Sequence, residues 1–205
     1  RAQALMRLQR IKVLALIALL AIAPGCVRHR PPAEDGVLVI SQEQQASWVR
    51  NFNPLSPATA PRFPTISGVY EPLYVFNSVH SEFVPWLALR HTWSEGNRLL
   101  TFTTRSGVSW SDGRPFSARD VAFTFNLLAK FPALDRGNVW DRLLESVEAP
   151  DDTTVELRFK RVFVPGMEEL VAQKIVREHI WSTIEDPVAF PNANRVGAGP
   201  FTEVK

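Results

Sequence analysis

The sequence predicts a mixed α/β protein, and three kinds of segment carry this prediction. Residues 99–104 and 154–159 alternate apolar with polar side chains, which is the pattern of half-buried strands. Residues 118–130 carry apolar side chains at helical spacing, so we expect a helix there that buries Val121, Phe125 and Leu128. Residues 37–40 (Val-Leu-Val-Ile) are continuously apolar, as in a strand that is covered on both faces.

The start of the expected helix is marked by a turn and a cap. Glycine tolerates a positive φ angle, so Asp112-Gly113 predicts a tight turn. Ser117 and Asp120 have the spacing of a capping box. We therefore interpret both aspartates as turn and cap groups rather than catalytic acids. Trp110 lies on a strand that enters the turn, which favours a core position over the alternative, a ring that stacks on a ligand.

The other elements follow from the same patterns. Residues 91–93 are expected to pair with 99–104 around a turn at 95–97, and the strand 154–159 is expected to follow a turn at 150–152. Short helices are expected at 164–171 and 178–184, and the four prolines of 51–64 indicate an ordered loop. Residues 68–79 fit either a helix or a strand.

The first 25 residues have the layout of a signal peptide. A cationic start precedes the apolar run Val13–Ala23, which is too short to span a bilayer comfortably. The alternative is a buried helix of a cytosolic protein. Cys26 is the single cysteine and directly follows this segment, so it resembles the acylated cysteine of a bacterial lipoprotein, the alternative being an incidental cysteine beside an ordinary cleavage site. Residues 1–25 are thus the predicted lipoprotein signal peptide, and 26–36 the anchor and tether.

Charge and motif content narrow the function classes. The formal net charge is +2, but without the four basic residues of the first 25, 19 basic residues face 21 acidic ones. This balance predicts no nucleic-acid partner. The four histidines form no zinc-protease motif, and the sequence has no nucleophile elbow, phosphate-binding loop or dinucleotide fingerprint. We therefore predict no enzyme, no cofactor and no metal; Asp151-Asp152 is more typical of a solvated turn than of a metal pair.

Residues 108–121, Val-Ser-Trp-Ser-Asp-Gly-Arg-Pro-Phe-Ser-Ala-Arg-Asp-Val, resemble the hallmark of the extracellular solute-binding proteins of family 5, the dipeptide and oligopeptide receptors of ABC importers. Further similarities extend the resemblance to nearly everything from 37 to 205: Asn53-Pro54, Gly68-Val69-Tyr70-Glu71-Pro72-Leu73, the segment 150–155, His179-Ile180-Trp181, and Val196-Gly197-Ala198-Gly199-Pro200-Phe201. Ala198 replaces the threonine that the family more often has at this position.

The resemblance implies a truncated α/β lobe of the type II periplasmic-binding-protein kind, with an adjoining α+β subdomain. On this mapping, 37–61 is a first-lobe segment, 62–195 the adjoining subdomain, and 196–205 the return to the first lobe. Family members run to roughly five hundred residues, so the other ligand-clasping lobe is expected to lie elsewhere in the receptor. The resemblance also favours a helix over 68–79 that carries Tyr70, Leu73 and Tyr74 toward the core.

The resemblance further implies a receptor that captures peptides, or oligosaccharides, outside the cytoplasmic membrane and delivers them to the permease subunits of an ABC importer. Its expected location is the periplasm, anchored to the cell membrane by a lipid on Cys26. Ligand contacts are expected on the loop after the first strand, with Gln42 and Glu43 as polar partners and Trp48 and Phe52 as apolar faces; surface or core roles are the alternatives. Two other functions stay open, a sensory or chaperone-like surface protein with the same fold and a secreted hydrolase.

Overall fold

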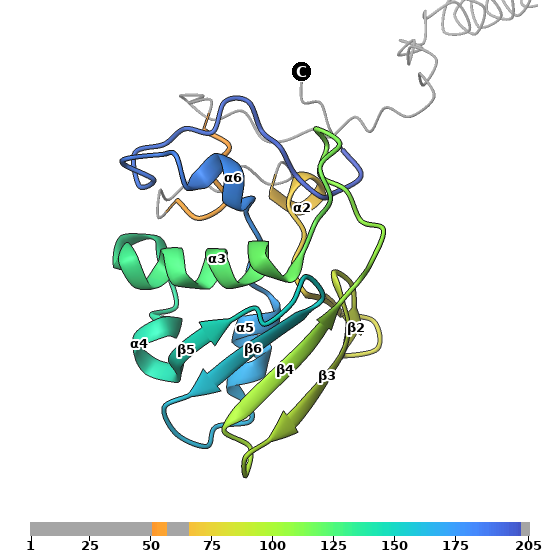
Figure 1. Ribbon diagram of the computed structural model, residues 1–205. Helices are drawn as coiled ribbons and strands as arrows, with labels where there is room; N and C mark the ends of the chain where they lie inside the picture. The colour runs from red at the N-terminus through yellow and green to blue at the C-terminus, as the bar shows by residue number, and fades with distance from the viewer. Residues whose placement is uncertain (1–50, 57–65, 202–205) are drawn as a thin grey trace, which may run out of the picture. The chain divides into compact units, whose positions relative to one another are not determined.

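The computed structural model of the chain describes residues 51–56 and 66–201 (Figure 1). Contacts divide the chain into two units, 1–43 and 44–205, and all described residues belong to the second. The predicted signal peptide, the lipid anchor at Cys26, the tether and the strand at 37–40 lie outside the described residues. The predicted domain boundaries therefore stay predictions.

The main structural layer is a four-stranded antiparallel sheet with the order β3-β4-β6-β5. Its strands are β3 (Ala88–Ser94), β4 (Leu99–Thr104), β6 (Thr154–Phe159) and β5 (Leu144–Glu148). The alternation in β4 and β6 buries every second residue, as the sequence predicts: Leu100, Phe102, Val155, Leu157 and Phe159 have no exposed surface. One face of β4 and β6 is thus buried in the core.

Helix α3 (Ala118–Lys130) packs against β5 and β6 (Figure 1). Val121 and Phe125 are fully buried and Leu128 is 1% exposed, which confirms the expected helix face. Burying a side chain of this size stabilises the fold by roughly 1.5–3 kcal/mol relative to leaving it in water. Four short helices follow α3 in the chain: η1 (Pro132–Leu134), α4 (Val139–Leu143), α5 (Gly166–Val171) and α6 (Glu178–Trp181).

Asp120 organises the start of α3. Its carboxylate accepts hydrogen bonds from the Ser117 backbone N–H at 3.0 Å, from the Trp110 indole at 3.2 Å and from the Glu178 backbone N–H at 3.0 Å. These bonds confirm Asp120 as a cap group, and Trp110, which is 2% exposed, as a core residue. Gly113 has φ +84°, as the predicted turn requires. One buried carboxylate therefore ties this turn to both α3 and α6.

The single helix expected over 68–79 is wrong. Helix α2 ends at Val69 (Ile66–Val69), and β1 (Tyr74–Asn77) follows as a strand that pairs only with β2 (Glu82–Pro85). The physical reason is Pro72, which has no backbone donor and disfavours helical geometry at the residue before it. Tyr70, Leu73 and Tyr74 are nevertheless buried, as expected.

The local turns agree with the sequence. Residues 95–97 all have positive φ angles and join β3 to β4. Asp151 accepts backbone hydrogen bonds from Thr153 and Thr154, at 2.7 and 2.8 Å, ahead of β6. These bonds lower the pKa of Asp151, first through the Thr153 backbone. Asp151 is thus a turn residue, which is the solvated role that we expect for it.

Candidate functional site

Three segments that are distant in the sequence meet in one place, which we call the junction: residues 51–56, 66–71 and 187–201. The Gly199 N–H donates to the Val69 carbonyl and the Phe201 N–H to the Gly68 carbonyl, both at 3.0 Å. The Phe52 N–H donates to the Pro191 carbonyl at 2.8 Å. The chain therefore passes the same point on its way into residues 70–195 and on its way out.

Two glycines allow the backbones of the junction to touch. A Cβ atom on Gly197 would lie 1.8 Å from the carbonyl oxygen of Val69, and one on Gly199 would lie 2.2 Å from that of Gly68. No side chain fits at either distance, so these positions require glycine. From the sequence, Gly197-Ala198-Gly199-Pro200 indicates only a turn. The alternate spacing of the two glycines, which puts both on one side of an extended segment, is the signal that would have revealed a close approach.

The turn at 110–113 is fastened to the junction. The Ser111 N–H donates to the Gly197 carbonyl at 2.9 Å, and the Gly197 N–H donates to Ser111 Oγ at 3.4 Å. The next residue, Asp112, accepts from the Arg114 N–H at 3.3 Å, as expected of a turn residue, and also forms an ion pair with Arg177. This ion pair was not predicted, because Arg177 is far away in the sequence.

Arg177 is a buried cation next to a histidine. Its side chain has no exposed surface, and its Nε donates to Nδ1 of His179 at 2.9 Å. Burial lowers the pKa of Arg177. Burial, and then the positive charges of Arg177 and Arg114, lower the pKa of His179. Since Nδ1 accepts the arginine's hydrogen bond, His179 is neutral in this arrangement, with its proton on Nε2 toward Asp112 at 3.5 Å.

Amide side chains hold the loops of the junction together. Asn53 Nδ2 donates to the carbonyls of Pro187 and Phe190 at 2.9 and 3.0 Å. Asn192 Nδ2 donates to the carbonyl of Phe52 at 3.3 Å and to the hydroxyl of Tyr70. Burial raises the pKa of Tyr70, so this hydroxyl stays neutral. The junction is thus a buried polar network, in which donors and acceptors from separate loops satisfy one another.

The structure places one of the four predicted ligand contacts. Phe52 lies in the junction and is 6% exposed, with the guanidinium of Arg195 at 4.6 Å from its ring centroid. This geometry is a cation–π contact. Gln42, Glu43 and Trp48 lie outside the described residues. The part of all four in ligand binding stays a prediction.

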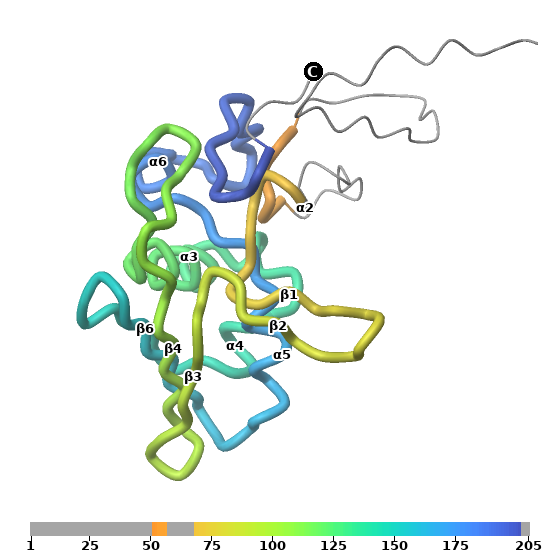
Figure 2. Tube along the Cα trace, turned by 90° about the vertical axis from the view of Figure 1, so that its right-hand side faces the viewer, coloured from red at the N-terminus to blue at the C-terminus, as the bar shows by residue number. Residues whose placement is uncertain are grey.

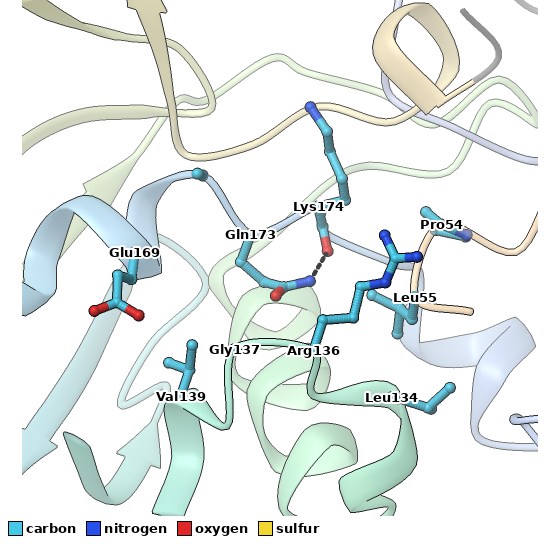
Figure 3. A pocket seen from close by; sticks show the side chains of 10 residues that line it. Pro54, Leu55, Leu134, Arg136, Gly137, Val139, Glu169, Gln173 and Lys174 are labelled. Atoms are coloured by element: carbon cyan, nitrogen blue, oxygen red, sulfur yellow. Dashed lines mark hydrogen bonds between the residues drawn. The ribbon is translucent and has the colours of Figure 1, made fainter. Parts of the chain in front are cut away.

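A hollow of about 250 Å³ opens beside the first segment of the junction (Figure 3). Pro54 and Leu55 line one side, and the remaining lining comes from the turn before α4 and from the end of α5. Two cations, Arg136 and Lys174, belong to the lining, and burial lowers the pKa of Lys174. The residues that line the hollow come from separate segments without a common motif, so the sequence does not predict this hollow. Glu169, at the edge of the hollow, accepts two hydrogen bonds from the guanidinium of Arg142, at 3.0 and 2.8 Å.

Two further findings concern the described residues. Within 51–56 and 66–201, no three histidine, cysteine or acidic side chains gather in a way that would hold a metal ion. Over the same residues, no helix has the length and apolar character needed to cross a membrane. What the junction offers chemically is hydrogen bonding, an aromatic ring with a cation above it, and close backbone packing.

Comparisons with known proteins agree with the resemblance. Residues 82–205 match the model of the bacterial extracellular solute-binding proteins, family 5 Middle. The chain is 31% identical over 169 residues to the nickel-binding periplasmic protein of Escherichia coli (strain K12), which covers 79% of this chain and 29% of that protein.

Solved structures give the same result for the fold. The periplasmic oligopeptide-binding protein of an ABC transporter from Thermotoga maritima is 34% identical, with a TM-score of 0.67, over 74% of this chain and 28% of that one. A second structure of that protein, bound to mannohexaose, has a TM-score of 0.66 at the same identity and coverage. The expected fold class is thereby confirmed, and the chain spans less than a third of the length of these relatives. The chain belongs to the bacterial extracellular solute-binding proteins, family 5.

Proposed function

We propose that this chain is part of a receptor that captures peptides or oligosaccharides outside the cytoplasmic membrane and delivers them to the permease of an ABC importer. The family match over residues 82–205 is the observation that carries this proposal. The ligand classes come from relatives: the Thermotoga maritima protein is named as an oligopeptide-binding protein, and one of its structures holds mannohexaose.

The junction supports a mechanism of lobe closure. The backbones at 68–69 and 197–201 are hydrogen-bonded side by side, and the turn at 110–113 is fastened to them. A movement of the first lobe would therefore reach the subdomain through a packed contact rather than through a loose linker. A ligand favours the closed receptor only by binding it more tightly than the open one. Gln42, Glu43, Trp48 and Phe52 are our candidates for first-lobe contacts.

The proposal includes export and anchoring. The cationic and apolar character of residues 1–25 supports export, and the position of Cys26 supports acylation. Two acyl chains on one cysteine suffice for stable membrane attachment, whereas one is marginal. Metabolic labelling with a fatty acid tests this part, since Cys26→Ser must abolish the label.

Calorimetry on the full-length receptor tests the function. Saturable binding of an oligopeptide or a manno-oligosaccharide is expected, and alanine at Gln42, Glu43 or Trp48 should weaken it. Phe52→Leu must be accompanied by an unfolding measurement, because Phe52 is mostly buried. Absence of binding to both ligand classes would contradict the proposal. If the receptor binds a solute, but deleting the permease genes does not reduce uptake of that solute, the sensory alternative is favoured instead.

A further inference from the structure

One hairpin concentrates the exposed apolar surface of the described residues. We call residues 74–89 the arm; it comprises β1, β2 and the first two residues of β3. Seven large hydrophobic side chains are strongly exposed within the described ranges, and five of them belong to the arm: Val75 (39%), Phe76 (52%), Val79 (83%), Trp86 (44%) and Leu89 (43%). The arm has one acidic residue and no lysine, arginine or aspartate. Such a concentration marks an interaction surface.

Both faces of the arm carry apolar side chains near its base, and one of them ends on a polar pair. Residues that stand opposite each other in the hairpin share a face, so Phe76 lies with Phe83 on one face and Val75 with Val84 on the other. The rings of Phe76 and Phe83 are 5.1 Å apart. An antiparallel hairpin with one solvated face normally has polar side chains there. In the paired strands of the arm only the outermost pair, Asn77 and Glu82, is polar, so most of both faces is apolar and suited to contact with a partner.

The base of the arm is firmly held. Leu73, Tyr74, Leu87 and Ala88 are at most 5% exposed, and the N–H groups of Trp86 and Ala88 donate to the Leu73 carbonyl at 3.0 and 3.1 Å. Beyond this base, β1 and β2 form a two-stranded sheet of their own, which extends away from the main sheet (Figure 2). A fixed base with an exposed outer part is a geometry suited to docking, because little freedom is lost on binding.

The chemistry of the arm favours a protein partner over a lipid surface. β1 and β2 pair only with each other, so each leaves one edge without a strand neighbour, and open edges are not stable in the hydrocarbon of a bilayer. Phenylalanine, tryptophan and arginine are enriched in protein interfaces. Arg90 and Arg105 lie exposed beside the arm, and neither forms an ion pair within the described ranges. The fitting partner has an apolar groove with acidic residues at its rim.

We propose that the arm docks into the external surface of the importer's permease, an inference that rests on the proposed function. The arm begins four residues after Tyr70 of the junction and is joined to it by the buried Leu73. Glu71, which lies between Tyr70 and Leu73 in the sequence, accepts a hydrogen bond from the side chain of Trp86. The docking surface is therefore next to the point where lobe movement enters the subdomain, where a permease can distinguish a loaded receptor from an empty one.

Site-specific crosslinking in intact membranes tests which partner covers the arm. The full-length receptor carries a photoreactive residue, Val79→benzoylphenylalanine, and the matched control carries it at Val162, which is 55% exposed outside the arm. A crosslink to a permease subunit from position 79 and not from 162 is the expected result. Crosslinks from 79 only to lipid, only within the receptor, or to nothing would each overturn the proposal.

Transport measurements supply a second, independent test. The double variant Phe76→Ser/Val79→Ser should lower solute uptake at least tenfold while the receptor's solute affinity stays unchanged. Val162→Ser/Val164→Ser, which removes two exposed apolar side chains elsewhere, should leave uptake unchanged. Unimpaired uptake in the arm variant contradicts docking. If the wild-type receptor binds no solute, the proposed function is contradicted rather than the docking of the arm. The crosslinking experiment tests docking without requiring that a solute be bound.

Discussion

Replacing Gly197 by alanine should loosen the junction by a predictable amount. The added Cβ would lie 1.8 Å from the carbonyl oxygen of Val69, whereas ordinary van der Waals contact begins at 3.4 Å. The two backbones must therefore separate by about 1.6 Å, which breaks the 3.0 Å hydrogen bond from Gly199 to Val69. Overpacking costs roughly 1–3 kcal/mol and a lost backbone hydrogen bond about 1 kcal/mol, so we expect a local destabilisation of about 3 kcal/mol.

Hydrogen exchange followed by mass spectrometry measures this loss in the full-length receptor. A destabilisation of about 3 kcal/mol corresponds to roughly hundredfold faster exchange at the amides of Gly199 and Phe201. Gly107→Ala is the control, because Gly107 has φ +77° but nothing within 4 Å of its added Cβ. That variant should cost about 1 kcal/mol at its own turn and leave the junction amides unchanged. Exchange in Gly197→Ala within threefold of wild type would refute the argument.

Three further predictions concern hydrogen-bonded polar side chains. Asp120→Asn should lower the free energy of unfolding, measured in urea, by about 2–4 kcal/mol, because the NH₂ group of asparagine would face N–H groups that now donate to the carboxylate. The control Asp152→Asn, which removes an exposed ion pair, should cost under about 0.5 kcal/mol. His179 has a lowered pKa in the folded protein, so the free energy of unfolding should fall as the pH drops below about 6.5. His179→Gln should make this pH dependence weaker, and an unchanged pH dependence would show that His179 is not its source. Tyr70→Phe should cost about 1–2 kcal/mol, because the buried Asn192 amide keeps its bond to the Phe52 carbonyl but loses the one to the tyrosine hydroxyl. A stability equal to that of the wild type would show that this hydrogen bond is not needed.

Local patterns in the sequence were enough for the elements that bury one face. The strand 99–104, the strand 154–159 and the helix 118–130 all have clear periodicity, and the structure confirms them. β5 was not predicted, because Leu-Glu-Ser-Val-Glu is short and its pairing is irregular between Leu144 and Ser146. The segment 68–79 was ambiguous by pattern, and the resemblance pointed to a helix where the chain forms a hairpin.

The junction was much less predictable than the core. Asn53 bonds carbonyls 134 and 137 residues further along the chain, and its partner loop is rich in proline and has no periodic pattern. A polar side chain in such a loop looks the same in a sequence whether it is solvated or buried. Phe52 was identified as a candidate from its place after the first strand, but its burial under Arg195 follows only from the folded arrangement.

The hydrogen bond between Gly68 and Phe201 brings together two points of the chain that are far apart in the sequence, and this has a consequence for how such a chain can evolve. Residues 70–196 leave and rejoin at one point, which is the arrangement expected of a module inserted into the predicted first lobe. Closing a short gap costs the host little chain entropy, whatever the size of the module. A module of this kind can be lengthened, exchanged between relatives or removed without rewiring its host, which makes it a natural unit for grafting into other receptors.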